Sequence, residues 1–464
     1  MEFFTKAVSL IFSLSILVVL HELGHFIPAK LFKTKVEKFY LFFDPWFSLI
    51  KKKVGDTVYG IGWLPLGGYV KIAGMVDESM DKEQMKEDPK PWEFRTKPAW
   101  QRLIIMVGGV TVNILLAIAI YAMSMYTWGK DVLPASSVYK NGVQVSPVLK
   151  GYGFKDFDKL VSIDGEVLHL FSDFQSKIIL DNAKQVTVNR NGNDTLIHIS
   201  QQLPLDVISS RQSMFSPLVE FRVEKFAESS INKNSGLRKG DLIVGINGRP
   251  TRFFQFFAKE LRKDSCNLVA LDVKRGTDQI KVNVKVDQYG KIGVYNQSVD
   301  SLLTFETLEF SFFESIPAGF NEMVSTLSGY IKQLKYMLTS EGIQQVGGFG
   351  SIGGLFPDSF SDVDYWQKFW SITALLSVIL AVMNLLPIPA LDGGHVMFLL
   401  YEIIFRRKPG EKFMEYAQMT GMILLLSLML YANGKDLFNG ITGSDEEIKS
   451  CWESIEDDSL DKKK

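Results

Sequence analysis

Long apolar runs alternate with stretches of mixed polarity along this chain of 464 residues. Three of the runs are long: the first ends at Leu20, and the other two cover residues 103–127 and 369–388. A fourth run, residues 419–432, is shorter and is extended by the milder stretch 414–418. Because about 20 apolar residues span the hydrocarbon core of a bilayer as a helix, this pattern predicts an integral membrane protein.

The first run resembles a cleaved signal peptide in its lysine, Lys6, and in its short apolar core. No small-residue cleavage site follows it, however, and we therefore interpret it as a retained membrane helix. The predicted fold class is a polytopic α-helical membrane protein with β-rich segments between the helices. Its four transmembrane segments are predicted at residues 1–30, 102–130, 366–405 (with a following half-helix) and 409–435.

Basic residues gather in two of the loops between these spans. The first loop carries Lys30, Lys33, Lys35, Lys38, Lys51, Lys52, Lys53, Arg95, Lys97 and Arg102, and the last carries Arg406, Arg407, Lys408 and Lys412. The positive-inside rule places both loops in the cytoplasm. The N-terminus, the region between the second and third spans and the acidic tail, residues 436–464, then lie on the other side. We interpret the tail as a solvated segment and assign it no function.

The first cytoplasmic loop, residues 31–101, contains short runs that are typical of β-strands. Asp-Pro, Gly-Asp and Pro-Leu-Gly-Gly sequences separate these runs, as in turns. Several runs are apolar on both faces, which is unusual for a small solvated sheet. Two interpretations stay open: a sheet that dips into the membrane interface beside the first helix, or a small soluble hairpin domain.

The region between the second and third spans contains an internal repeat. Residues 153–168, GFKDFDKLVSIDGEVL, align with residues 236–251, GLRKGDLIVGINGRPT. In both, an alternating apolar strand leads into an Asp-Gly or Asn-Gly pair, which is typical of a tight hairpin turn. We predict two similar β-rich modules in tandem, module 1 near residues 131–217 and module 2 near 218–300. Residues 301–365 are predicted to form an amphipathic interfacial helix and a glycine-rich return to the membrane.

Composition and charge narrow the candidate chemistry. The net charge is −1, so nothing indicates a nucleic acid or another polyanion as a partner. Only two cysteines occur, Cys266 and Cys451, which allows neither a disulfide framework nor a cysteine zinc site. We interpret both cysteines as structural or incidental. A bound metal ion would have to be held by histidine and carboxylate side chains.

The sequence HELGH, residues 21–25, directly follows the first apolar run. Residues four apart share one face of a helix, so His21 and His25 can bind one metal ion while Glu22 projects beside it. This is the H-E-x-x-H arrangement, with two ligands and a base for a metal-bound water. The alternative is that both histidines line a conduction path, because ionisable groups in membrane helices usually mark a function of some kind.

A catalytic zinc ion also needs a third protein ligand and an open position. Residues 384–398, NLLPIPALDGGHVMF, interrupt the third apolar run with two prolines and a Gly-flanked turn. Broken backbone at membrane depth is tolerated only where it faces protein or a wet cavity. We therefore predict Asp392 as the third ligand, with His395 as the competitor, for which we favour a supporting or interfacial role. Capping of the following helix by Asp392 is compatible with ligation.

HELGH on the first membrane helix and NLLPIPALDGG on the third resemble the site-2 protease family of intramembrane zinc metalloproteases, and the resemblance covers nearly the whole chain. The family pattern N-x-x-P-x-P-x-L-D-G matches at Asn384, Pro387, Pro389, Leu391, Asp392 and Gly393. WLPLGGYVKIAGM resembles the membrane-reentrant β-hairpin of the family, and Gly109 and Asn113 match its Gly-x-x-x-Asn in the second span. Val110 departs from the proline of many bacterial relatives. The two modules resemble the tandem PDZ pair of the RseP-like branch, the regulators of sigma-E proteases.

The resemblance implies a role for each matched residue. His21, His25 and Asp392 would bind one zinc ion, and Glu22 would activate a water molecule. Asn384 would hydrogen-bond the substrate backbone or the oxyanion, a role that amide donors can perform.

The substrate must also unwind, because each carbonyl of a transmembrane helix is bonded within the helix. An edge strand could hold the unwound segment by β-augmentation. Gly67, Gly68, Tyr69 and Val70 begin a run with the β-branched and aromatic character that such a strand needs.

By resemblance, the substrates are single-pass membrane proteins, such as an anti-sigma factor already trimmed by a site-1 protease, and remnant signal peptides. The protein would lie in the bacterial inner membrane with its active site near the cytoplasmic side. The PDZ modules would lie in the periplasm and either gate substrates by size or capture a C-terminal carboxylate.

Two other classes of function compete with a protease. A catalytically silent membrane scaffold would have lost a ligand or the base, yet all four positions are intact. A metal or proton transporter would distribute ionisable residues across its spans, and the second and fourth spans offer almost none.

Overall fold

The computed structural model describes residues 2–442 except residues 66, 76–87, 211, 228–229, 298, 338, 340–341 and 343–345. The chain divides into two compact units. The membrane unit comprises Met1–Lys130 and Glu309–Ser444, and the strand-rich unit comprises Asp131–Leu308. Of the predicted acidic tail, residues 443–464 lie outside the described residues.

The membrane unit contains four helices that are long and apolar enough to cross a membrane, as the hydropathy pattern predicts. These helices are α1 (Glu2–Leu31), α3 (Ala99–Trp128), α13 (Tyr365–Leu385) and α15 (Glu411–Thr442). The last one continues past residue 435, where the sequence pattern places its end. Three further helices complete the unit: α10 (Phe312–Met337), α12 (Phe349–Gly353) and α14 (Asp392–Phe405).

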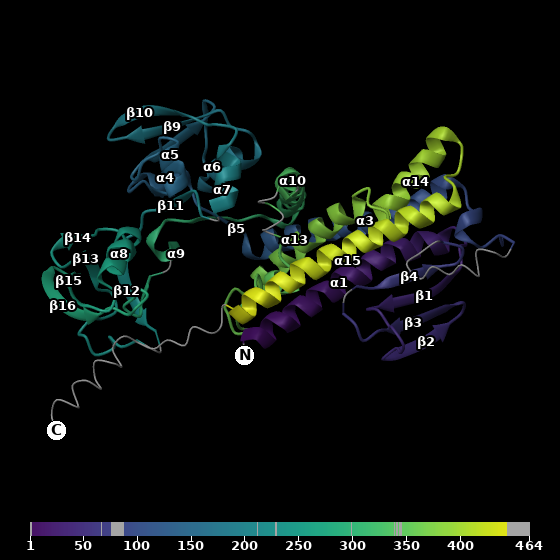
Figure 1. Cartoon of the computed structure of the whole chain (residues 1–464), viewed down its shortest axis with the longest axis horizontal. Helices are drawn as coiled ribbons and strands as arrows, with labels where there is room; N and C mark the ends of the chain where they lie inside the picture. Colours follow the sequence, from purple (N-terminus) through teal and green to yellow (C-terminus); the bar gives the residue numbers. More distant parts are fainter. Residues whose placement is uncertain are drawn as a thin grey trace, which may run out of the picture. The chain divides into compact units, whose positions relative to one another are not determined.

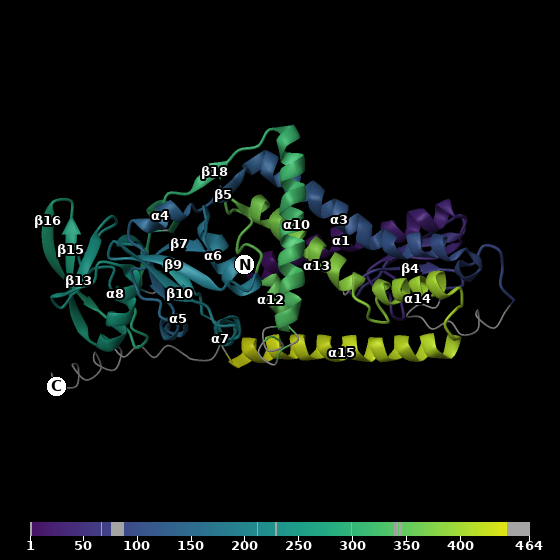
Figure 2. The ribbon, with the colours of Figure 1, turned by 90° about the horizontal axis from the view of Figure 1, so that it is seen from above.

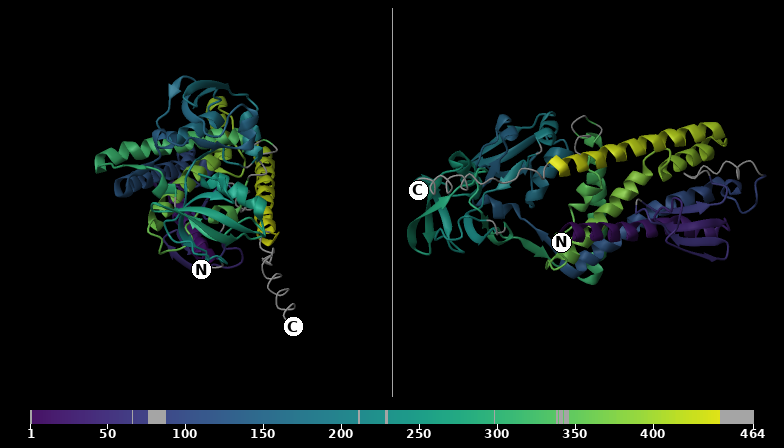
Figure 3. Two further views of the ribbon diagram at one scale, coloured as in Figure 1. Left: turned by 90° about the vertical axis from the view of Figure 1, so that its left-hand side faces the viewer. Right: turned by 60° about the horizontal axis from the view of Figure 1, so that its bottom comes forward.

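Helix α3 is the centre of this unit, since it packs against α1, α10, α13 and α14. Helix α15 lies to one side of the bundle and contacts α12 (Figure 2, Figure 3). There, the Asp436 carboxylate accepts hydrogen bonds from the backbone N–H groups of Gly348 at 2.9 Å and Ser351 at 2.7 Å. The predicted glycine-rich return is therefore one of the segments that join α15 to the bundle, together with the loop before α14, where Gly421 meets Pro389.

The backbones of α1 and α3 touch where their glycines meet. A Cβ atom on Gly24 would lie 2.4 Å from the carbonyl oxygen of Gly108, and one on Gly108 would lie 1.9 Å from that of Gly24. Real Cβ atoms do not approach so closely, so both positions need glycine, as in close helix packing in membranes. This contact brings the HELGH turn of α1 directly onto α3.

The loop between the first two spans forms a four-stranded sheet of order β2-β3-β1-β4. Its strands are β1 (Val36–Leu41), β2 (Ile50–Val54), β3 (Thr57–Ile61) and β4 (Tyr69–Ile72). Strand β1 is parallel to β3 and antiparallel to β4. Both β1 and β4 contact α1, so the edge strand β4 runs beside the HELGH helix (Figure 1).

The strand-rich unit contains two separate apolar cores, one in each predicted module. Module 1 contains α4 (Ala135–Tyr139), β6 (Val143–Val145), α5 (Pro147–Gly151), β7 (Lys159–Ile163), β8 (Glu166–Val167), α6 (Phe171–Leu180), β9 (Gln185–Arg190), β10 (Asn193–His198), α7 (Leu203–Ser210) and β11 (Phe215–Pro217). Module 2 contains β12 (Phe221–Phe226), β13 (Leu242–Ile246), β14 (Arg249–Pro250), α8 (Phe254–Leu261), β15 (Leu268–Arg275), β16 (Asp278–Lys285) and β17 (Val294–Asn296). Short segments flank them: β5 (Lys130–Val132), α9 (Val299–Leu302) and β18 (Glu306–Leu308).

Aligned residues of the two modules make the same contacts. Asp158 pairs with Arg190 in module 1, and Asp241 pairs with Arg275 in module 2. Both arginines also donate to the carbonyl oxygen of the glycine that opens the aligned sequence. In each module, therefore, an ion pair between one buried carboxylate and one arginine joins the start of the aligned strand to the end of a later strand.

Cys266 lies in module 2, shortly before β15. Cys451 lies outside the described residues.

Candidate metal centre

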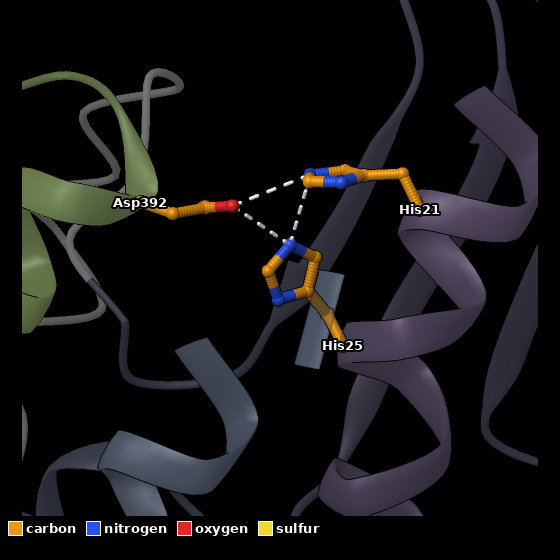
Figure 4. Close-up of side chains that lie close together, drawn as sticks. All are labelled: His21, His25 and Asp392. Atoms are coloured by element: carbon orange, nitrogen blue, oxygen red, sulfur yellow. Dashed lines mark hydrogen bonds and ion pairs between the residues drawn. The ribbon is translucent and has the colours of Figure 1, made fainter. Parts of the chain in front are cut away.

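The structure brings His21, His25 and Asp392 together, and these residues form the group in the described chain that could hold a metal ion. The two histidines lie one turn apart on α1, and Asp392 is the first residue of α14 (Figure 4). The cap of α14 is Leu391, which makes no side-chain capping bond. The Asp392 carboxylate points at the two imidazoles instead of capping its helix.

A tight return of the chain places Asp392 there. Helix α13 ends at Leu385, and Ala390 adopts a positive φ of 93° in the loop that follows. A Cβ atom on Gly393 would lie 2.2 Å from the carbonyl oxygen of Leu386, and one on Gly394 would lie 2.6 Å from Cα of Pro389. The Gly-Gly pair of the LDGG sequence is therefore needed for the first turn of α14 to pack against its own loop.

The three candidate ligand atoms form a nearly equilateral triangle. Nε2 of His21 and Nε2 of His25 lie 3.2 Å apart, and Asp392 Oδ2 lies 3.3 Å from the first and 3.2 Å from the second (Figure 4). Ligands bound tetrahedrally at about 2.0 Å from zinc are about 3.3 Å apart. The triangle therefore has the size of one face of a zinc coordination tetrahedron.

The hydrogen bonds around the triangle also fit a metal ion. Nδ1 of His25 lies 2.8 Å from the carbonyl oxygen of Ile105, which can only accept, so Nδ1 carries the proton and the lone pair of Nε2 faces Asp392. Asp392 Oδ2 is buried and has no hydrogen-bond partner among the residues that the structure describes. A buried carboxylate oxygen without a donor is costly unless a cation satisfies it.

Glu22 lies in the same cleft as the triangle. Val70 of β4 lines the same cleft, and β4 contacts the helix that carries Glu22. A Cβ atom on Gly68 would lie 3.6 Å from Cγ of Glu22 and 2.6 Å from a methyl group of Val18. The absence of a side chain at Gly68 thus lets β4 approach α1 beside the acid.

The remaining predicted residues are arranged around this cleft. Gly68, Tyr69 and Val70 line it, whereas Gly67, with a φ of 148°, packs beside the ring of Phe43. The amide nitrogen of Asn384 lies 3.3 Å from Nε2 of His21, which is one corner of the triangle.

His395 also lines the cleft but does not belong to the ligand group in the described part of the chain. Of the two candidates for the third ligand position, the geometry therefore favours Asp392.

Two residues of α3, Gly109 and Asn113, also lie at the site, although the sequence identified them only through their match to the family pattern. A Cβ atom on Gly109 would lie 2.5 Å from Cε1 of His21 and 2.5 Å from Nε2 of His25. The side chain of Asn113 reaches Nδ1 of His21 at 3.2 Å. Because residues four apart share a helix face, the Gly-x-x-x-Asn spacing predicts that both lie on one face of α3, and the crossing of α3 with α1 brings that face to the histidines.

A further link was missed because its residues are far apart in the sequence. Arg102 of α3 donates to Glu402 of α14 at 2.6 Å, and both side chains are largely buried. This ion pair fixes α14 against α3 and so helps to hold Asp392 in place.

Comparison with known proteins agrees with this geometry. The sequence model of Peptidase family M50 matches residues 9–428. Two relatives bear the name "Putative zinc metalloprotease": that of Vibrio cholerae is 26% identical over 94% of this chain and 98% of its own length, and that of Treponema pallidum is 26% identical over 91% and 97%. The metalloprotease MmpA of Caulobacter vibrioides is 25% identical over 94% of this chain and 96% of its own length. The chain therefore belongs to peptidase family M50, the site-2 protease family of zinc metalloproteases.

Proposed function

We propose that this protein is an intramembrane zinc endopeptidase that cuts single-pass membrane proteins within or next to their transmembrane segment. The observation that carries the proposal is the triangle of His21, His25 and Asp392, built on the apolar helix α1 and on α14, with Glu22 in the same cleft. A peptide-bond-cutting site on such helices suits a substrate that is itself a membrane helix.

Each residue has a distinct task in the proposed reaction. When held by His21, His25 and Asp392, zinc supplies Lewis-acid polarisation of the carbonyl and lowers the pKa of water to about 7. Glu22 accepts the proton of the attacking water and passes it to the leaving nitrogen. Asn384, whose amide lies beside His21, donates to the carbonyl oxygen as negative charge develops on it.

Strand β4 is proposed to hold the unwound substrate. It is the edge strand of its sheet, so its outer backbone groups are available for pairing with an extended peptide. Gly68, Tyr69 and Val70 line the cleft that also contains Glu22. A peptide paired with β4 would therefore pass beside both the base and the metal ligands.

We also propose the arrangement relative to the bacterial inner membrane. The basic loops support a cytoplasmic location for the β1–β4 sheet and an active site near that side. Exposed aromatic rings on this sheet, Trp46 and Phe47 stacked on Trp63, support contact with the membrane interface.

The two modules are proposed to be PDZ domains on the periplasmic side that exclude substrates with a bulky extracytoplasmic domain. Their separate cores and their matching Asp–Arg contacts support a duplicated domain. Substrates would then be proteins already trimmed by a site-1 protease, such as an anti-sigma factor, and remnant signal peptides. Deletion of the modules should allow cleavage of an untrimmed substrate that the full chain rejects.

The test of the proposed reaction is cleavage of a single-pass substrate in detergent by the wild type and by Glu22→Gln. We expect cleavage to fall by about 10²–10⁴-fold, the usual loss for a general base, while zinc stays bound. A zinc chelator should abolish cleavage by the wild type. Glu2→Gln is the matched control, since Glu2 lies on the same helix with a mostly exposed side chain and should leave cleavage unchanged.

Two results would contradict the proposal. Cleavage that survives Glu22→Gln would exclude Glu22 as the base. Tight zinc binding without cleavage of several helical substrates, even after deletion of both modules, would favour the membrane scaffold.

A further inference from the structure

Asn113 is a buried side chain beside a proposed zinc ligand. It lies on α3 with none of its surface exposed, and its Nδ2 is 3.2 Å from Nδ1 of His21. Its Oδ1 is buried and has no hydrogen-bond partner within the described chain. A buried amide at a metal site with an unpartnered oxygen requires a physical explanation.

The two ends of the Asn113 amide are nearly equal in size, so the group can present either end to the imidazole. If Nδ2 faces His21, the donor meets Nδ1 as an acceptor, and the proton of His21 must then sit on Nε2, which faces Asp392. If Oδ1 faces His21, the oxygen accepts a hydrogen bond from Nδ1–H and no longer lacks a partner. Only the second arrangement leaves the lone pair of Nε2 free for a metal ion.

The neighbouring ligand has the same arrangement. His25 donates its Nδ1–H to the carbonyl oxygen of Ile105, also on α3, at 2.8 Å. Ile105, Gly109 and Asn113 follow each other at four-residue spacing, so all three lie on one face of α3. Along that face, Ile105 orients His25, Gly109 leaves room for both imidazoles, and Asn113 lies at His21.

The backbone of Asn113 is itself held in place. Ser377 of α13 donates to the carbonyl oxygen of Asn113 at 2.7 Å, and neither residue is exposed. The amide therefore projects from a point where α13 and α3 are joined, which restricts its position relative to α1.

We infer that Asn113 is a positioning residue for zinc: its Oδ1 accepts the Nδ1–H of His21, which fixes the ring orientation and the tautomer in which Nε2 can bind the metal. This inference rests on the ligand set of the proposed function. Partners of this kind typically contribute 10- to 100-fold to metal affinity.

The test is zinc affinity of the full chain in detergent, measured by competition with a chromophoric chelator. Asn113→Leu keeps the size of the side chain but removes the acceptor, and we expect about 10- to 100-fold weaker zinc binding. Asn113→Asp restores an acceptor oxygen and should return the affinity to within a few-fold of the wild type. The control is Thr373→Val, which removes a buried hydrogen bond between α13 and Ser13 of α1 without touching Asn113 or an imidazole and should leave zinc affinity unchanged.

The thermal stability of each variant without zinc separates positioning from folding. An Asn113→Leu protein that is as stable as Thr373→Val yet binds zinc weakly supports the inference. Unchanged zinc affinity in Asn113→Leu, or an Asn113→Asp protein that binds no better than Asn113→Leu, overturns it. His21→Ala separates a failure of the proposed ligand set from a failure of the role of Asn113. Full zinc affinity in His21→Ala would overturn the ligand set itself. Loss of zinc binding in His21→Ala together with normal binding by Asn113→Leu would overturn only the role of Asn113.

Discussion

Buried carboxylates in the two units of this molecule have opposite surroundings. In the strand-rich unit, Asp158 accepts two hydrogen bonds from Arg190, at 2.7 and 2.8 Å, and one from the backbone N–H of Lys155 at 2.8 Å. Asp241 is bonded in the same way to Arg275, at 2.7 Å to each oxygen. In the membrane unit, Asp392 Oδ2 faces two imidazole nitrogens and lacks a donor among the described residues.

This difference distinguishes structural from functional burial of charge. A buried carboxylate with a guanidinium and a backbone donor is fully satisfied by its own chain, and its role is to hold strands together. A buried carboxylate whose oxygen faces only other ligand atoms is satisfied by something the chain binds. Burial alone would have ranked Asp158 and Asp241, each with almost no exposed surface, above Asp392 as candidate site residues.

The largest effect is expected from closing the space between the imidazoles. Gly109→Ala puts a Cβ atom 2.5 Å from both His21 and His25, within the proposed zinc site. We expect stoichiometric zinc and all measurable cleavage to be lost, which atomic absorption and the cleavage assay would show. Gly434→Ala is the matched control, since a Cβ atom there meets nothing within 4 Å. Normal zinc content in Gly109→Ala would disprove the position of the site.

The same isosteric change in the two units tests the comparison itself. Asp392→Asn removes a ligand charge, so zinc affinity should fall by more than the roughly 100-fold upper cost of losing an outer partner. The fold should remain, because the carboxylate makes no structural ion pair with Lys or Arg in the described chain. Zinc titration and thermal unfolding of the zinc-free protein would measure both quantities. An Asp392→Asn protein that binds zinc normally but unfolds easily would reverse the assignment.

Asp241→Asn should have the opposite outcome. It leaves the guanidinium of Arg275, which is 31% exposed, beside a neutral amide, so the charge-assisted bonds that join β15 to the start of β13 are weakened and module 2 should lose stability. Zinc affinity should stay unchanged, since Asp241 belongs to the other unit. Hydrogen exchange of Leu268–Arg275 in the full chain would report the loss of stability. Equal protection in wild type and variant would contradict a structural role.

Acid should weaken the strand-rich unit through the same residue. Burial raises the pKa of Asp241, but hydrogen bonds from Arg275 and the Arg238 backbone, with the charges of both arginines, outweigh burial and hold it below its ordinary value. Because the folded-state pKa lies below the unfolded value, about 3.9, this stabilisation is present above that pH and is lost as the pH falls toward the folded-state pKa. The protection factors of module 2 amides, which correct for the intrinsic pH dependence of exchange, should therefore fall on acidification, and less so in Asp241→Asn. An identical pH dependence in both proteins would assign the acid sensitivity to other groups.

The sequence was sufficient where function depends on spacing along one element. The His21 and His25 pair follows from helical periodicity, and Asp392 stands out as a carboxylate in a broken apolar run. The role of Asn113 could not be derived in this way, because it depends on where α1 crosses α3, and that crossing is determined by the contact of Gly24 with Gly108. No local pattern specifies which of several small residues will meet.

Long-range pairs were inaccessible to sequence reasoning for the same physical reason. Arg102 and Glu402 are separated by 300 positions. In the sequence, each is a charged residue at the end of an apolar helix, and nothing near it indicates the partner. The aligned sequences of the two modules did indicate a common structure, yet the arginine partners, Arg190 and Arg275, lie outside the aligned stretch. Only the pairing of the strands in the structure identifies these arginines as the partners of the aspartates.

The smallest predicted effect comes from an aligned position where one module has glycine and the other has a bulky residue. Gly240 has a φ of 89°, and its counterpart Phe157 has a φ of 73°, in the left-handed region that bulky residues avoid. Phe157 stacks on Phe256 at 5.4 Å, which offsets that strain, whereas a side chain at Gly240 would have nothing within 4 Å to pack against. Gly240→Ala should therefore destabilise module 2 by about 1–2 kcal/mol, measured as faster hydrogen exchange in β13 and β15. Zinc binding should be unaffected. Phe157→Gly relieves the backbone strain but loses the ring stack, so its net effect on stability should be smaller. A larger loss of stability than in Gly240→Ala would show that the aromatic contact between the modules, and not the backbone conformation, dominates at this position.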